Sequence, residues 1–390
     1  MSTRRPIFEE VSDPAPKRAT PGERPERNGA AGLIDTPDTG ARRGIRIWLW
    51  ILLLMVMTMI AVGGLTRLTD SGLSITQWKP ISGALPPLSA ADWQDAFQKY
   101  QASPEYKLQN KGMSLSAFQS IYWWEWGHRE LGRLIGVVWA LGFFGFLLAG
   151  KIPRGWRGRL FLLGVLGGLQ GALGWWMVSS GLVGRMVDVA SYRLAMHLGL
   201  GFIIMGTILW FLMGLGRTGV DLLQARRARE PRLQRLSSIM AGLVFFQVIL
   251  GALVAGIDAG RSYVDWPLMD GSFLPPESFD LSPLWSNFFE NAALVQFDHR
   301  MIGYLVFLFG ATLWWQSRNS PHRATRLAFD WMMAMILLQV SLGIATVMNA
   351  AAPHIAIVHQ VGAILTLGLI LRARFLSAYP LPQSLRQGAA

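Results

Sequence analysis

The chain has 390 residues, of which 52% are hydrophobic and only 15% are charged, and its formal net charge is +12. A soluble domain has about 25% charged residues, and uncharged runs of about 20 residues, enough to cross a bilayer, recur here, so the composition excludes a soluble globular protein. The chain contains no Cys, which excludes disulfides, thiolate-held metal sites and covalent cofactor attachment through C-x-x-C-H.

Residues 1–44 are rich in Pro, Arg, Glu and Gly and have no sustained apolar period, which predicts a disordered tail. The segment lacks the short apolar stretch of a signal peptide, and its acidic residues are atypical of a mitochondrial transit peptide.

Eight uncharged runs follow, which predicts eight membrane spans. They are Ile47–Thr66, Leu134–Gly150, Leu160–Gly184, Leu194–Gly216, Leu236–Ile257, Met301–Gln316, Trp331–Ala352 and Ile355–Leu371. The second and sixth runs are expected to extend backwards, to about Tyr122 and Ala292, and these extensions bring charged residues into the membrane.

Most of the 36 Lys and Arg lie in the terminal tails and in the loops near 151–159, 215–235 and 316–326. By the positive-inside rule both termini are cytoplasmic, with 217–236 a cytoplasmic linker and 376–390 a cytoplasmic tail. The basic charge is therefore a topology signal, and no folded basic module for nucleic acid is present.

The opposite side carries two long loops, 67–121 and 258–291, which are rich in Trp, Pro and Asp. We expect these loops to fold as caps over a site within the membrane.

The two halves of the chain repeat each other. Recurring pairs are Asp70/Asp258, Trp78/Trp266, His128-Arg129/His299-Arg300 and Leu169-Gln170/Leu338-Gln339. Each half contains four spans, and an even number of spans returns the chain to the side from which it entered. Both halves therefore enter the membrane from the same side, so the repeats are parallel and their pseudo-twofold axis runs along the membrane normal. The predicted fold is an all-α integral membrane protein of eight transmembrane helices, arranged as two parallel four-helix bundles, 45–216 and 237–375.

Four of the six histidines are predicted at one depth near the outer face, two in each bundle: His128, His197, His299 and His359. A single membrane histidine is most simply an interhelical hydrogen bond, but four at matching depth favour a functional site. The other two, His322 and His354, are expected on the surface.

Two imidazoles that face each other across a bundle can hold haem iron without covalent attachment. The sequence therefore predicts two bis-histidine haem sites, His128 with His197 and His299 with His359. Zinc or copper is the alternative, although tetrahedral zinc would need the separated pairs to come together.

Three arginines lie beside or one turn above these histidines: Arg129, Arg193 and Arg300. They are candidates to pair with haem propionates, and ordinary snorkelling to the interface explains them about as well.

The halves differ beside the first histidine. Glu125 lies one helical turn before His128, whereas the equivalent position before His299 is Gln296. An ion pair with Arg129 is the structural alternative, and the functional interpretation is that the first haem is where bonds change. The second haem would then be a resident cofactor or electron carrier.

Four motifs carry a resemblance to a known family: Gly63–Ser74, Trp78-Lys-Pro80, Glu125–Arg133 and Asp298–Gly303. Residues 44–375 resemble haem A synthase, in the Cys-free branch found in alphaproteobacteria and mitochondria.

The resemblance implies oxidation of the C8 methyl group of haem O to the formyl group of haem A, by two successive hydroxylations and a dehydration. It implies haem b on His299 and His359 and the substrate haem O on His128 and His197, with Glu125 as the acid–base group. It also implies a bacterial inner-membrane protein, with the haem sites near the periplasmic face and surrounded by membrane lipid. Haem O synthase, the protohaem farnesyltransferase, is a possible docking partner, and the electron acceptor is left open.

Two other functions fit the same repeat. A bis-haem membrane cytochrome that exchanges electrons with quinone would use the same ligands and topology, and Glu125 and the motifs argue against it. A haem transporter would need sites at a second depth, and the four histidines share one.

Overall fold

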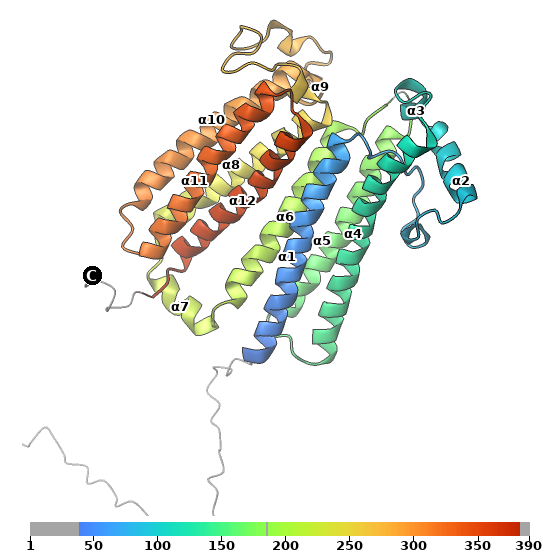
Figure 1. Ribbon diagram of the computed structural model, residues 1–390. Coiled ribbons are helices and arrows are strands. Elements are labelled where there is room, and N and C mark those ends of the chain that lie inside the picture. The colour runs from blue at the N-terminus through green and yellow to red at the C-terminus, as the bar shows by residue number, and fades with distance from the viewer. Residues whose placement is uncertain (1–38, 185, 383–390) are drawn as a thin grey trace, which may run out of the picture. The chain divides into compact units, whose positions relative to one another are not determined.

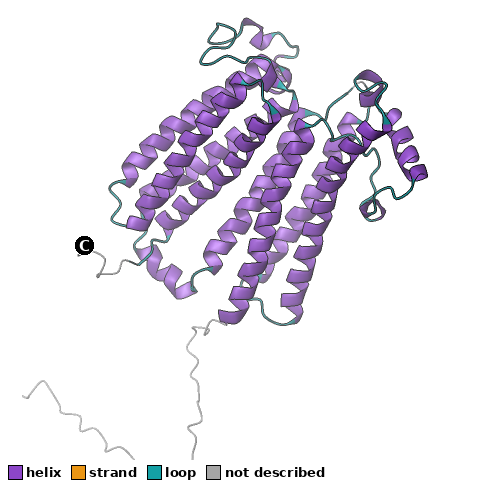
Figure 2. Cartoon of the chain, in the orientation of Figure 1, coloured by secondary structure: helices purple, strands orange, loops and turns teal. Residues whose placement is uncertain are grey.

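A computed structural model of the chain describes residues 39–184 and 186–382. In this part of the chain the regular structure is helical and contains no strand (Figure 2). Most of the predicted tails, 1–38 and 383–390, lie outside the described residues. The first helix, α1 (Thr39–Leu68), and the last, α12 (Pro353–Ala378), each extend a few residues into a predicted tail.

Eight helices are long and apolar enough to cross a membrane, which confirms the eight predicted spans. In addition to α1 and α12 they are α4 (Leu115–Leu148), α5 (Arg157–Gly181), α6 (Ser191–Leu215), α8 (Pro231–Gly256), α10 (Ala292–Ser317) and α11 (Arg323–Met348). Helix α10 begins at the predicted residue, where Asn291 caps it by accepting hydrogen bonds from the first backbone amides. Helix α4 begins earlier than predicted, at a cap formed by Ser114.

The eight helices form two rings of four (Figure 1). In the first ring α1 contacts α4 and α6, and α5 joins α4 to α6. In the second ring α8 contacts α10 and α12, and α11 joins α10 to α12. The rings meet where α1 packs on α12 and α6 packs on α8. Because α1 corresponds to α8 and α6 corresponds to α12 in the repeat, these two contacts are equivalent to each other, as the predicted twofold axis requires; the axis itself stays a prediction.

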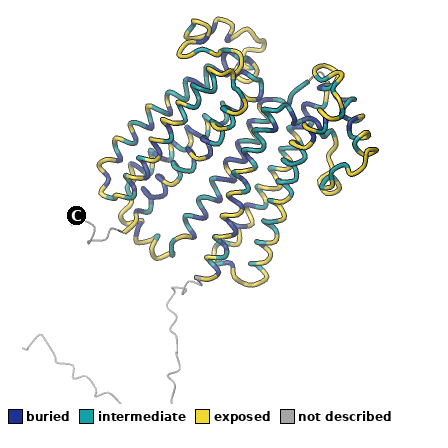
Figure 3. The backbone as a smooth tube through the Cα atoms, viewed as in Figure 1, coloured by how far each residue is buried: buried dark blue, intermediate teal, exposed yellow. Residues whose placement is uncertain are grey.

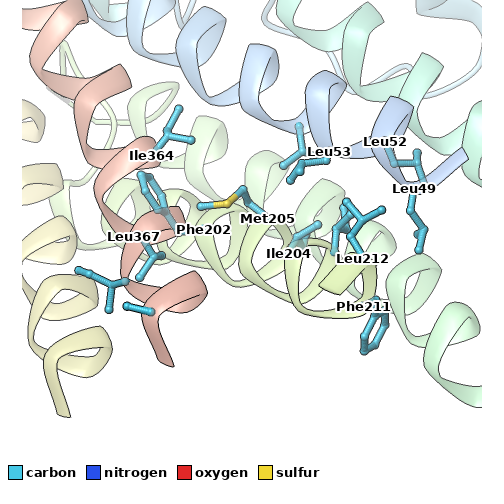
Figure 4. Close-up of a cluster of buried hydrophobic side chains, with 14 of the residues drawn as sticks. Leu49, Leu52, Leu53, Phe202, Ile204, Met205, Phe211, Leu212, Ile364 and Leu367 are labelled. Carbon is cyan, nitrogen blue, oxygen red and sulfur yellow. The ribbon is translucent and has the colours of Figure 1, made fainter. Parts of the chain in front are cut away.

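The buried core runs along the line where the rings meet, whereas the outer helices expose apolar side chains (Figure 3). Leu49 and Leu53 of α1, Met205 of α6, and Ile364 and Leu367 of α12 belong to one buried cluster (Figure 4). Helices α4 and α5 are the least buried of the eight. An apolar lateral surface of this extent would not suit water but suits the hydrocarbon core of a bilayer.

Short helices lie in the two long loops, at one end of the helix rings (Figure 1). The first loop contains η1 (Ser82–Ala84), α2 (Ala90–Gln101) and α3 (Pro104–Leu108); the second contains η2 (Ala259–Arg261), η3 (Pro276–Phe279), η4 (Leu284–Ser286) and α9 (Asn287–Glu290). Helix α7 (Gly219–Arg227) lies in the linker between the rings. Aromatic side chains pack the first loop onto the start of α4, with Tyr100 and Phe118 fully buried between them.

One arginine joins the halves at this end. Arg67, which is only 12% exposed, binds the carboxylates of Asp70 at 2.7 Å, Asp188 at 3.4 Å and Asp258 at 2.7 Å. Asp70 and Asp258 are equivalent residues of the two repeats, so this cluster fixes the outer loops of both halves to the end of α1.

Candidate functional site: two pairs of cradled histidines

The four predicted histidines lie on the second and fourth helices of the two rings, namely α4, α6, α10 and α12. His197, His299 and His359 lie within about two turns of the start of their helices. His128 lies further along its helix, because α4 begins at Leu115 and not near Tyr122 as predicted. Its place in the repeat is unchanged.

Each histidine ring packs against a glycine of the preceding helix of its ring. A Cβ atom built on that glycine would lie 2.8–3.1 Å from the histidine Cε1 atom, whereas ordinary carbon contacts are about 3.5–4.0 Å. The pairs are Gly63 with His128, Gly174 with His197, Gly251 with His299, and Gly343 with His359. Only glycine permits this approach. We call each of these four glycine–histidine contacts a cradle.

The sequence reasoning did not single out these glycines, although the repeat contains the signal for them. Gly174 and Gly343 follow the repeated Leu-Gln motif, and Gly63 and Gly251 precede the repeated aspartates by equal distances. A glycine that recurs within an apolar span indicates a close approach by another group.

Three of the histidines are also held through their backbone carbonyls. Gln170, Gln247 and Gln339 donate from Nε2 to the carbonyl oxygens of His197, His299 and His359, at 3.0, 2.8 and 2.7 Å. Each of these hydrogen bonds joins two neighbouring helices of one ring. His128 has no such donor, because Met59 occupies the place that Gln247 has in the second half.

The histidine pairs suit a metal-centred group. In all four rings Nδ1 is buried and has no hydrogen-bond partner, which is costly unless a ligand meets the ring. The ring centroids of His299 and His359 are 6.5 Å apart. Two metal–imidazole bonds of about 2 Å, with the ring radii added, require a similar separation. Throughout the described residues, no group of three or more His, Cys, Asp or Glu could hold a metal, so the ligands come as pairs.

Glu125 is buried above the first pair, and its carboxylate is fully hydrogen-bonded. Oε2 accepts from Ser74 Oγ and from the backbone amide of Ile75, both at 2.7 Å. Oε1 accepts from Nε and Nη2 of Arg129, at 3.0 and 2.5 Å. The ion pair with Arg129 is therefore present, and the carboxylate also fastens the outer loop to α4.

In the second half, hydrogen bonds also join the outer loop to its helix, α10, but no carboxylate takes part. Gln296 donates from Nε2 to the carbonyl oxygen of Tyr263 at 3.0 Å, and Arg300 donates to the same oxygen at 3.0 Å. Tyr263 is the repeat equivalent of Ile75, whose carbonyl oxygen accepts from Arg129 at 2.8 Å. Both loops are thus clamped above the histidine pair, but only the first clamp contains a negative charge.

The three arginines predicted to meet propionates all have protein partners. Arg129 and Arg300 bind loop carbonyls, and Arg193 donates to the carbonyl oxygen of Trp176 at 2.7 Å and stacks on its ring. Their role toward propionates stays a prediction. His322, which is half-buried before α11, and His354, which is exposed on α12, stand apart from the pairs.

A second buried carboxyl group lies in the first loop. Glu105 is 3% exposed, and burial, together with the negative charge of Glu125, raises the pKa of Glu105 to about 8. Its partners are the amide of Asn110 at 3.4 Å and the hydroxyl of Tyr100. At neutral pH this side chain is therefore mostly protonated, unlike an ordinary surface glutamate.

Known proteins resemble this chain over its whole length. Residues 46–371 match a protein family described as cytochrome oxidase assembly protein. The chain is 61% identical over 391 residues to a haem A synthase of Dinoroseobacter shibae, and the alignment covers 100% of both chains. It is 58% identical over 388 residues to a haem A synthase of Ruegeria pomeroyi, covering 99% of this chain and 100% of that protein. These comparisons confirm the resemblance that the motifs indicated.

Proposed function

The chain belongs to the family of cytochrome oxidase assembly proteins, and we propose that it acts as a haem A synthase. The proposed reaction oxidises the C8 methyl group of haem O to the formyl group of haem A. Two successive hydroxylations give a geminal diol, which loses water. The observation that carries the proposal is the presence of two histidine pairs with matching glycine contacts, of which only the first has a buried carboxylate, Glu125, one helical turn away.

We assign the substrate to the first pair and the resident cofactor to the second. His128 and His197 would hold the iron of haem O, and His299 and His359 would hold haem b. The assignment is supported by Glu125, because a reaction that releases protons and develops positive charge needs a negative group nearby. When bound, haem b supplies a one-electron redox centre.

The residues around the first pair suggest how the methyl group reacts. An iron held by both His128 and His197 has no open position for oxygen. We therefore favour removal of two electrons and one proton from the methyl group, with the electrons passing to an external one-electron acceptor, followed by attack of water on the resulting cation. Glu125 would stabilise that positive charge, and it would take the proton of the attacking water once Ser74 turns its hydroxyl away. Each hydroxylation then releases two electrons and two protons.

The remaining residues exclude water and hold the site in place. Arg129 holds the Glu125 carboxylate between the first loop and α4, and the short helices α2 and α3 of that loop lie beside the end of α4 (Figure 1). We propose that the protein lies in the bacterial inner membrane with cytoplasmic termini and with both haem sites near the periplasmic face. Haem O synthase would supply the substrate.

The test is haem extraction and chromatography from membranes of cells that make this protein together with a source of haem O. Wild type is expected to yield haem A, whereas Glu125→Gln is expected to accumulate haem O or a hydroxylated intermediate. Glu130→Gln is the matched control, because it removes a partly exposed carboxylate from the same helix. Ser74→Ala, which removes one tether but keeps the charge, is expected to retain partial conversion.

Two outcomes would contradict the proposal. Full conversion by Glu125→Gln would show that the carboxylate only fastens the loop. If wild type bound haem b and yielded only unmodified haems, the bis-haem cytochrome that exchanges electrons with quinone would be the better function.

A further inference from the structure

A cavity lies far from the histidines, where the two rings meet at the end opposite the long loops. Its volume is about 530 Å³, within the range of ligand-binding pockets, and α1, α6 and α12 line it. Leu53 of α1, Met205 of α6 and Ile364 of α12 form its deep part and lie close to one another in Figure 4. This part of the cavity is wholly apolar.

Three arginines lie at the other end of the cavity: Arg46 on α1, Arg372 on α12, and Arg217 just after the end of α6. The lining contains no acidic residue. Asp221 lies near Arg217, but its carboxylate accepts a hydrogen bond from the backbone amide of Thr218 at 3.0 Å. Asp221 therefore offsets part of the charge of Arg217, and the three arginines leave a net positive charge beside an apolar groove.

These arginines are only partly engaged by the protein. Arg217 donates to the carbonyl oxygens of Tyr379 at 2.7 Å and Pro380 at 3.3 Å. Nε of Arg46 is buried without a hydrogen-bond partner, and Arg372 is exposed. The groove thus combines a positive rim, whose guanidinium groups have N–H donors that the protein does not use, with an apolar interior.

The length of the groove matches one leaflet of a bilayer. The helix rise is about 17 Å from Arg46 to Met57 on α1, and about 15 Å from Met205 to Leu215 on α6, which ends two residues before Arg217. Half of a hydrocarbon core of about 30 Å is about 15 Å. A lipid whose headgroup lies at the arginines would therefore place its acyl chain along the apolar walls.

We propose that this groove is a binding site for one anionic phospholipid of the leaflet on the arginine-rich side. The phosphate is bound by Arg46, Arg217 and Arg372, and one acyl chain fills the space between α1, α6 and α12. Basic pockets between transmembrane helices on the cytoplasmic side bind anionic headgroups in this way. The lipid joins the two rings where they meet, and the inference does not depend on the reaction proposed above.

The test is native mass spectrometry of the purified full-length protein, titrated with phosphatidylglycerol or with phosphatidylcholine. Wild type is expected to bind one phosphatidylglycerol in preference to phosphatidylcholine. Arg46→Gln combined with Arg372→Gln is expected to weaken phosphatidylglycerol binding about thirtyfold, or about fivefold for each arginine, without changing phosphatidylcholine binding. If the double variant does not fold, Arg46→Gln alone tests the same point with a fivefold change.

Two further variants separate the rim from the interior. Gly368 lines the groove, and a Cβ atom there would meet only Leu209, at 3.7 Å, so Gly368→Leu fills the space without disturbing the charges. It is expected to weaken the binding of both lipids. Arg226→Gln with Arg227→Gln removes two exposed charges from α7 at the same end, and binding is expected to be unchanged.

Three results would overturn the proposal. The first is equal binding of the two lipids by wild type. The second is a loss in the Arg226 and Arg227 variant as large as that in the rim variant, which would indicate attraction to the basic end in general. The third is displacement of the lipid by inorganic phosphate at the same concentration as the lipid, which would show that the acyl chain contributes nothing.

Discussion

Substituting alanine for the cradle glycines tests the geometry of the histidine pairs most directly. A Cβ atom at Gly63 or Gly174 would lie 2.8 or 2.9 Å from a histidine Cε1 atom, and at Gly251 or Gly343 the distance would be 3.0 or 3.1 Å. To restore a contact of about 3.5–4.0 Å, each ring must move by roughly 0.4–1.2 Å. Metal–ligand bonds tolerate about 0.2 Å. The displacement is therefore larger than the bond allows at all four positions.

The displaced group is a side chain, so the fold itself is expected to survive. Overpacking of this kind costs about 1–3 kcal/mol, which a helical membrane protein of this size should tolerate. We expect Gly251→Ala and Gly343→Ala to lose resident haem while they stay folded. We expect Gly63→Ala and Gly174→Ala to keep the resident haem but to convert less haem O. Because their contacts are shorter, these two changes should displace the histidine rings further than the changes at Gly251 and Gly343.

The assay compares haem content and absorbance spectra of the purified variants with their thermal unfolding in detergent. Gly171→Ala on α5 and Gly242→Ala on α8 are matched controls, because a Cβ atom at either position meets no atom within 4 Å. Full haem content and an unchanged spectrum in Gly251→Ala would refute the reasoning. So would equal losses in the control variants.

Two further predictions concern the outer loops. Arg67→Met removes the cation that Asp70, Asp188 and Asp258 share, although Asp258 keeps Arg261 at 3.6 Å. The change should destabilise the protein by about 1–3 kcal/mol in thermal unfolding, and an unchanged stability would contradict a role of Arg67 in joining the halves. Glu105 has a pKa raised from 4.5 to about 8, because burial disfavours its charge. Its contribution to stability is complete below about pH 4.5 and falls as the pH rises to about 8, so Glu105→Gln should flatten the pH dependence of unfolding in that range, and an unchanged slope would contradict the shift.

Hydropathy predicted the eight spans because bilayer thickness sets the minimum length of an apolar helix. The repeat predicted that His128 and His299 lie on equivalent helices, and they lie on α4 and α10. The early start of α4 was missed, because the residues between Ser114 and Tyr122 are held as a helix by packing against the first loop and not by an apolar run. The short helices of the loops were missed for the same reason.

The contacts of Glu125 could not be predicted from the sequence either. Two of its four donors, Ser74 and Ile75, come from a loop that lies about fifty residues earlier in the chain. The ion pair with Arg129 is local, one helical turn away, and was therefore open to prediction. Long-range hydrogen bonds depend on the path of a loop, which residue patterns do not define.

The differences between the halves are as informative as the repeat. The four glycine–histidine contacts agree within 0.3 Å, so the scaffold that holds the histidines has been kept in both halves. The charges around it have not, because Glu125 and Arg67 of the first half correspond to Gln296 and Ala255 of the second. A buried charge in a membrane protein is expensive and persists where it serves a function. The second half instead has Asp298 beside His299, where the first half has Gly127. Glu125 and Arg67 near the first histidine pair support the proposal that this pair holds the substrate and that the second pair holds the cofactor.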